Sequence, residues 1–338
     1  MKSINRHTGS VALVATLAMN LLYSGSALAT DDGARAYWKG REGTQGFSIQ
    51  YLNLDLQASD SQQFAPGQYV YPGADVEATL MIANYARNLV LFDLLSTVSF
   101  GVASGSLDAA FDVGSPMSPT PLVAYSESAS GYADPFVQLD VNLYGTPPMK
   151  RNFELYDYEP TWTIDVATML ALPIGAYDSD KLVNLGQNRW FGRIALPVKY
   201  HFGVFAPGYM SSFELIPSVW LFAENDDFMG QKLENDPILQ IEAHLTSDFT
   251  RSLWGSLDLL YRGGFQSEID GVETGDELDI GDLGYTLNFQ VNDNLGIRGS
   301  FSSNVFGDSD LDNSMIRLQL VYGWHNQMEN IKKLQRGH

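Results

Sequence analysis

The chain has no cysteine, little positive charge and no long hydrophobic run beyond its N-terminus. The lack of cysteine excludes disulfides, thiol catalysis and thiolate metal sites. Its 338 residues include 20 Lys and Arg against 40 Asp and Glu, a formal net charge of −20, which argues against nucleic acid as a partner. Because no stretch after residue 29 approaches the ~20 apolar residues that a spanning helix needs, a helical membrane span is excluded.

The first 29 residues have the pattern of a secretory signal peptide. Lys2 and Arg6 form a basic start, residues 11–22 are mostly apolar, and Ala27-Leu28-Ala29 has the A-x-A form of a cleavage site. An uncleaved N-terminal helix is the alternative, but the apolar run is short for it. Loss of these residues would take the formal charge to −22. That acidity fits either a cell-surface protein with acidic outer loops or simple solubility.

Alternating apolar and polar residues are the main structural signal. In the segment 315–324, Ile316, Leu318 and Leu320 fall on one side, while Arg317 and Gln319 fall on the other. This period of two is that of a β-strand with an apolar and a polar face. A transmembrane β-barrel needs such strands, with the apolar face toward lipid and the polar face toward a wet lumen. The 17 tyrosines, 18 phenylalanines and 31 glycines suit β-structure with aromatic girdles.

The whole chain is predicted to be an all-β, transmembrane, antiparallel up-and-down β-barrel of about twelve strands. The barrel spans residues 44–325, preceded by a periplasmic segment at 30–43 and followed by a polar tail at 326–338. The expected strands are 44–57, 75–84, 89–102, 133–143, 160–172, 190–202, 211–223, 237–245, 252–265, 278–291, 295–305 and 315–325.

The connections between these strands alternate in length. Those after odd strands are long and polar, and most after even strands are tight, such as 85–88 and 292–294. Outer-membrane barrels have short periplasmic turns and long outer loops, so both termini are expected in the periplasm. Residues 144–159 are longer than a turn, and we expect a short helix or plug there. The loop 103–132 is expected to be an outer lid or to fold into the lumen.

A charge on the lipid face would cost ~2–4 kcal/mol at the middle of the bilayer, so charged strand residues must face inward. The first strand is less regular, because Leu52, Leu54 and Leu56 are out of phase with Phe47 and Ile49. A bulge, or a strand end beyond the membrane, would explain this. The residues expected to line a pore are Asp140, Asp165, Arg193, Lys199, His201, Glu214, Glu242, His244, Asp258, Arg262, Asp282, Arg298 and Arg317.

Two interpretations of this mixed-charge lumen are open. The charges could set up a transverse field in a pore, or they could form a salt-bridge network that fills a narrow barrel. Twelve strands give a lumen between the filled eight-stranded barrels and the open porins of 16–18 strands, so strand number does not decide between them.

A set of short motifs lies in the loops around the fourth to sixth strands. Ala133-Asp134-Pro135 opens one strand, and Pro173-Ile174-Gly175 and Asn184-Leu185-Gly186-Gln187-Asn188-Arg189-Trp190 precede another. Proline fixes φ, glycine permits a turn and asparagine bonds the backbone, so a structural role is favoured over direct substrate contact. The motif residues are Asp134, Pro135, Pro173, Gly175, Asn184, Asn188 and Trp190.

This set resembles the outer-membrane protein family associated with the meta-cleavage pathway of phenol degradation, over roughly residues 46–324. The resemblance implies a β-barrel in the outer membrane of a Gram-negative cell that passes aromatic or other small hydrophobic molecules. The expected partners are outer-membrane lipid and such solutes, with no nucleic acid; the oligomeric state is left open. Transport would be passive, because the sequence has no nucleotide-binding motif.

Other functions receive less support from the residues. A lipid hydrolase needs a serine beside a histidine, but no G-x-S-x-G occurs, and His201 and His244 are expected to face inward. The acidic runs 178–180 and 308–312 could bind calcium but lack full ligand spacing, so solvated loops are favoured. We therefore expect no enzyme activity, cofactor or metal. A non-conducting barrel that displays acidic loops, and a secreted β-sandwich, are the remaining alternatives.

Overall fold

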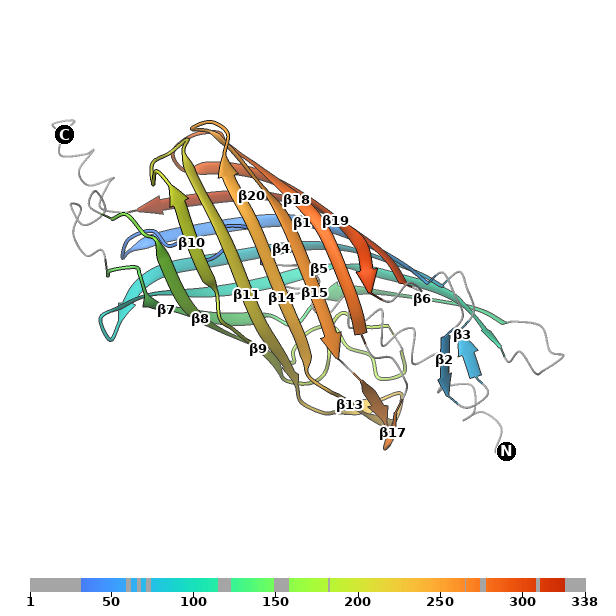
Figure 1. The fold of residues 1–338 in the computed structure, drawn as a ribbon. Helices are drawn as coiled ribbons and strands as arrows, with labels where there is room; N and C mark the ends of the chain where they lie inside the picture. The colour runs from blue at the N-terminus through green and yellow to red at the C-terminus, as the bar shows by residue number, and fades with distance from the viewer. Residues whose placement is uncertain are drawn as a thin grey trace, which may run out of the picture.

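In a computed structural model, the chain forms a closed antiparallel barrel of twelve strands (Figure 1). The structure describes residues 32–58, 62–65, 68–70, 74–114, 123–148, 158–181, 183–264, 266–273, 278–307 and 311–325. The barrel strands are β1 (Thr44–Ala58), β4 (Ala74–Leu91), β5 (Leu94–Gly114), β7 (Phe136–Tyr144), β8 (Trp162–Ala171), β9 (Phe191–Ala195) with β10 (Val198–Gly203), β11 (Met210–Phe222), β14 (Ile238–Asp248), β15 (Leu253–Gly264), β18 (Leu278–Gln290), β19 (Leu295–Gly307) and β20 (Leu311–His325).

Neighbours in the sequence are neighbours in the sheet, and the last strand closes on the first. β20 pairs with β1 without a break, from Thr44 opposite His325 to Ala58 opposite Leu311. β9 and β10 lie in line between β8 and β11 and together form one barrel strand. The predicted fold class is thus confirmed, and every expected strand is present.

Alternation along the strands separates two faces. On β20, Leu318 is 55% exposed and Arg317 is 5% exposed. The outer face carries large apolar side chains of this kind on every strand, including aromatic pairs such as Trp162 with Tyr200. Such a face is stable against lipid, and the buried face encloses the interior.

One end of the barrel carries tight turns, and we call it the turn end. The chain turns there at Phe92-Asp93 and at residues 292–294, and Thr44 and His325 pair at the same end. The predicted turn at 85–88 is wrong, since β4 runs on to Leu91. Phe92 and Asp93 both have positive φ, as in a two-residue hairpin turn that continues the register of its strands.

The opposite end, the loop end, carries additional β-structure. β5 and β6 (Val123–Tyr132) pair as a hairpin that lengthens the wall, rather than forming a lid or folding inward in the described part of 103–132. β2 (Gln62–Ala65) and β3 (Gln68–Val70) join the edge of β5. A second sheet is formed by β12 (Asn225–Phe228), β13 (Gln231–Asn235), β16 (Ser267–Ile269) and β17 (Val272–Glu273) (Figure 1).

The inner wall toward the loop end is apolar. Leu52, Leu54 and Leu56 point inward, and Asn53 and Asp55 take the outer face there. The pairing of β1 has no register shift, so a bulge does not explain the change of pattern. The buried apolar cluster on this part of the wall includes Leu52, Leu54, Leu56, Val76, Ala78, Leu80, Ile82, Ala103, Leu107, Ala109, Met169, Trp220, Ile280 and Met315.

The loop between β8 and β9 contributes to the same cluster. Val183 and Leu185 are buried against it, as is Phe228 of the second sheet. Side chains of this loop and of the second sheet thus pack against the apolar inner wall at the loop end.

Several expectations fall outside the described residues. These are the signal peptide at 1–29, the tail at 326–338, residues 149–157 of the helix or plug expected in 144–159, and most of the acidic run 308–312. Within the ranges given above, no helix has the length and apolarity to cross a membrane.

The apolar inner wall generates a stability prediction. Leu54→Ala should lower the free energy of unfolding of the refolded barrel by about 2–5 kcal/mol, because it leaves a cavity in a packed interior. Gln57→Ala, on the exposed face of the same strand, is the matched control and should change it by about 0.5 kcal/mol or less. Guanidinium unfolding followed by tryptophan fluorescence measures both. Equal effects would show that the loop-end interior is not packed.

Candidate functional site in the barrel interior

The inner wall from the middle of the barrel toward the turn end is polar. All the residues expected to line a pore lie on the inner face, where His201 and Arg298 are partly buried and the others are buried. Several of them alternate with exposed apolar neighbours, such as Ile194 beside Arg193 and Leu318 beside Arg317. Lipid on the outer face leaves the interior as the one place where these charges can be paired.

A segment that precedes the first strand enters this interior. Residues 32–43 were expected to lie before the barrel in the periplasm; their described contacts are instead with inner-wall side chains. The segment leaves the start of β1 near Asn88, whose carbonyl accepts from the N–H of Gly43. It then passes along the polar wall as far as Asp32. We call residues 32–43 the inner segment.

Lys39 of the inner segment lies in a cluster of carboxylates. Its ammonium contacts Asp140, and it donates to Asp165 Oδ1 at 2.6 Å. Lys199 reaches Asp165 Oδ2, also at 2.6 Å. The Lys39 side chain is 2% exposed. Two ammonium groups thus compensate two carboxylates that have almost no access to solvent.

Arg35 makes a second set of contacts on β11 and β14. Its Nη1 lies 2.7 Å from Asp248 Oδ1, and its backbone N–H donates to Glu214 Oε2 at 3.0 Å. Trp38 Nε1 donates to the other oxygen of Glu214 at 2.8 Å. The Arg35 guanidinium also lies 4.3 Å from the ring centre of Trp38 and 4.5 Å from that of Trp254. A fixed cation on two aromatic faces adds attraction to the ion pair.

Asp32 and Tyr37 form the third set of contacts. Asp32 pairs with Arg193, and its backbone N–H donates to Glu242 Oε2 at 2.8 Å. The Tyr37 hydroxyl donates to Asp32 Oδ2 at 2.5 Å and accepts from Arg193 Nη2 at 3.0 Å. Acids and bases of the segment therefore meet opposite charges on the wall.

Further pairs join neighbouring strands of the wall. His244 Nδ1 lies 2.7 Å from Asp258 Oδ1, and Thr286 donates to Asp258 Oδ2 at 2.7 Å. Arg262 Nη2 is 3.6 Å from Asp282 Oδ2. Of the two interpretations of the lumen charges, this geometry matches a network that fills the middle of the barrel.

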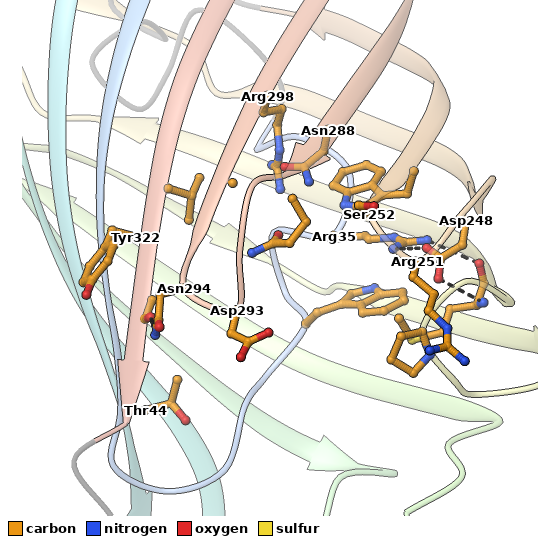
Figure 2. A pocket seen from close by; sticks show the side chains of 18 of the residues that line it. Arg35, Thr44, Asp248, Arg251, Ser252, Asn288, Asp293, Asn294, Arg298 and Tyr322 are labelled. Carbon is orange, nitrogen blue, oxygen red and sulfur yellow. Dashed lines mark hydrogen bonds and ion pairs between the residues drawn. The ribbon is translucent and has the colours of Figure 1, made fainter. Parts of the chain in front are cut away.

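A cavity of about 800 Å³ remains at the turn end, and Arg35 and Trp38 of the inner segment border it (Figure 2). Arg35 and Asp248 lie on one side of it, and Asn288 and Arg298 lie on another. Arg298 also stacks on Trp254, with its guanidinium 4.9 Å from the ring centre. Both charged and aromatic side chains line the cavity, among them Arg251 and Trp254, and it is open to solvent.

The loop motif ties the start of β7 to the β8–β9 loop. Asp134 is buried, and its two oxygens accept from the N–H groups of Gly175 and Gln187, each at 2.7 Å. Burial raises the pKa of the Asp134 carboxyl, and these backbone donors oppose the rise. A Cβ on Gly175 would lie 2.8 Å from the Cα of Gly186, so the close approach of the two chain segments requires glycine.

The other motif residues serve the same loop. Asn184 accepts from the N–H of Asp178 at 2.7 Å, and Asn188, at a φ of 56°, donates to Asn225. The carbonyl of Pro135 accepts from Leu172, and that of Trp190 accepts from Ala223. Pro173 lies within the loop. The contacts of the motif are therefore with the chain's own backbone and loops. Among the described residues, no group of three His, Cys, Asp or Glu is placed to hold a metal ion.

The sequence reasoning missed the inner segment. Asp32, Arg35, Tyr37, Trp38 and Lys39 lie outside any strand and carry no alternation, so the face argument does not reach them. One signal was present: Arg35, Lys39 and Arg41 form a basic group in a strongly acidic chain. They lie between the expected cleavage site and the first strand, where a segment can fold back into the barrel.

A closed barrel with an apolar outer face and paired charges across its middle defines the class: this is a transmembrane β-barrel of the outer-membrane type. The chain belongs to the family described as "Putative MetA-pathway of phenol degradation", which matches residues 59–309. No match was found among curated proteins.

One solved structure supports the fold. The COG4313 outer membrane channel from Pseudomonas putida F1 is similar with a TM-score of 0.66 and 16% identity, covering 86% of this chain and 99% of that one. The toluene transporter TbuX from Ralstonia pickettii has a TM-score of 0.36 and 9% identity, with 85% and 90% covered. The translocator domain of the autotransporter NalP from Neisseria meningitidis has 0.49 and 8%, with 93% and 99% covered. Likenesses as low as the last two do not bear on function.

Removal of the Lys39 ammonium tests the inner segment. Lys39→Ala should lower the free energy of unfolding by about 3–5 kcal/mol, because it leaves Asp140 and Asp165 with one buried counter-charge fewer. Lys232→Ala removes a lysine that bridges two exposed carboxylates, Glu224 and Glu234, and should have little effect. Equal losses in guanidinium unfolding would contradict the burial of Lys39.

Removal of the Asp134 carboxylate tests the loop motif. Asp134→Ala should cost about 1.5–3 kcal/mol, because two backbone N–H donors lose a charged acceptor. Asp134→Asn keeps one acceptor oxygen and should lose less. We expect faster proteolysis within residues 172–190 for Asp134→Ala, mapped by mass spectrometry of the fragments. An unchanged cleavage pattern would mean that the motif does not hold this loop.

Proposed function

We propose that the protein is a passive outer-membrane channel for small hydrophobic or aromatic compounds. The observation that carries the proposal is the apolar inner wall toward the loop end, formed by Leu52, Leu54, Leu80 and Leu107 among others. A barrel that serves hydrophilic solutes has a polar, water-filled lumen, in which the solute stays hydrated. An apolar wall instead favours solutes that gain free energy when they leave water.

The inner segment gives this channel a closed resting state. Arg35 and Lys39 cross the lumen as the counter-charges of three wall carboxylates, Asp248, Asp140 and Asp165. An apolar solute that reaches the middle of the barrel meets this layer of paired charge, which offers it no favourable contact. Passage then requires either movement of the segment or another way out. The family's association with phenol degradation supports phenolic compounds as the first solutes to test.

A non-conducting barrel that displays acidic loops is the second candidate. The observation in its favour is the ion-pair network itself, which fills the middle of the barrel. The two candidates differ in whether solute crosses the membrane, and that difference can be measured directly.

Uptake by cells decides between the two candidates. Cells that produce the protein should take up radiolabelled phenol or a larger aromatic hydrocarbon faster than cells with an empty vector. The lipopolysaccharide leaflet slows such solutes without a protein route. The test variant is Leu54→Asp, which puts a charge into the apolar wall and should reduce uptake. Heat-modifiable gel migration shows that the variant is folded. Uptake at the vector level by the correctly folded wild type would favour the non-conducting barrel.

A further inference from the structure

The inner wall is unevenly charged around the barrel. The acids that pair with the cations of the inner segment lie on one side, with Asp140 on β7, Asp165 on β8 and Asp248 on β14. β19, β20, β1 and β4 form a continuous stretch of wall on the other side. Among the described residues on the inner face of that stretch, the formally charged ones are Arg298 and Arg317. The interior therefore has an acidic side and a basic side.

The two arginines of the basic side approach each other. A Cβ on Gly33 would lie 3.0 Å from Arg317 Nη2 and 3.7 Å from Arg298 Nη1. Both guanidinium groups thus reach the same point beside the inner segment, and each has further contacts within the chain. Like charges that come this close repel, so a negative charge beside them is favourable.

The turn-end cavity lies between the two sides (Figure 2). Arg35 and Asp248 border it as an ion pair of 2.7 Å and balance each other. The other described lining residues with a formal charge are Arg251, Arg298 and Asp293. With His325 neutral, the described lining has more arginines than acids, although the whole chain has a formal net charge of −20. The cavity is thus a place in an acidic protein where an anion meets net positive charge.

Apolar side chains form another part of the lining. Trp38, Trp254 and Met210 all border the cavity. The guanidinium of Arg298 lies 4.9 Å from the ring centre of Trp254, so its position is fixed against an aromatic face. A volume of about 800 Å³ suits a small organic molecule, and sites of this kind combine apolar and aromatic side chains with a few polar groups that orient the ligand.

This combination selects one class of ligand. A carboxylate accepts two parallel N–H bonds from a guanidinium group, and an aromatic ring packs well on tryptophan. A neutral aromatic molecule would displace water from the arginines without replacing its hydrogen bonds. An inorganic anion would leave the apolar part of the lining in contact with water.

We propose that the turn-end cavity is a binding site for a small aromatic carboxylate. The carboxylate pairs with Arg298, and the ring packs on the apolar part of the lining. The site is separate from the apolar inner wall toward the loop end. It does not depend on the proposed passage of apolar solutes, and it holds equally for a barrel that does not conduct.

Calorimetric titration of the folded mature protein with benzoate, in an uncharged detergent, tests the class of ligand. Benzoate should bind saturably. Benzamide, which has the ring without the charge, and inorganic phosphate, which has the charge without the ring, should each bind about tenfold more weakly or worse. The absence of saturable benzoate binding would overturn the proposal. Equally tight binding of benzamide or of phosphate would overturn it too, because the charge or the apolar lining would then play no part.

Replacement of Arg298 tests the place of binding. Arg298→Gln should raise the dissociation constant of benzoate about tenfold or more, the loss expected for a charged hydrogen bond. Arg87→Gln is the matched control, because Arg87 is exposed on the outer face of β4 near the same end, and it should leave the constant unchanged. Benzoate binding of wild-type strength in correctly folded Arg298→Gln would overturn the site.

A variant that tightens binding does not depend on the tolerance of Arg298. Asp293→Asn removes an exposed acid from the lining and should lower the dissociation constant of benzoate about twofold to threefold. A gain of this kind does not arise from misfolding. If Arg298→Gln lacks the heat-modifiable migration of a folded barrel, this variant decides, and an unchanged or higher constant would overturn the proposal.

Discussion

The interior of this barrel depends on the pairing of buried carboxylates with cations that come from outside the strands. Asp140, Asp165 and Glu214 face inward because the outer face must be apolar. A carboxylate that is taken from water without a partner is costly. Lys199 alone does not balance Asp140 and Asp165, and Lys39 of the inner segment makes up the difference; Arg35 of the same segment pairs with Asp248 and donates its backbone N–H to Glu214. The wall therefore carries a charge pattern that fits one particular segment of the same chain.

This pairing divides the interior into two regions. Toward the loop end the wall is apolar and packs against Val183 and Leu185. In the middle, ion pairs cross the lumen. An interior of this kind differs from a water-filled pore. An apolar solute gains free energy on moving from water into the first region, and it gains none in the second.

The barrel was predictable because its signal is local. Alternation on β20 and β15 fixes which residues face lipid, and a charge on the wrong face is too costly to tolerate. The same reasoning placed Arg193, Glu242 and Asp258 on the inner face. It failed where a strand extends beyond the apolar outer band. The apolar residues of β1 change there from the outer face to the inner face, at Leu52, without any change of register. The turn at Phe92-Asp93 was missed because Phe92 is not typical of positive φ and Asp93 is the only turn residue in it.

The inner segment could not be predicted by these means, because its contacts join residues about 100–200 positions apart and follow no period. Its position is also the central claim. Hydrogen–deuterium exchange of the folded mature protein in detergent tests that claim most directly. Peptides that cover residues 32–39 should exchange slowly, since the N–H groups of Asp32 and Arg35 bond to Glu242 and Glu214. Glu214→Gln should speed their exchange while the barrel strands stay protected. Immediate exchange in the wild type would contradict a segment held inside the barrel by paired charges.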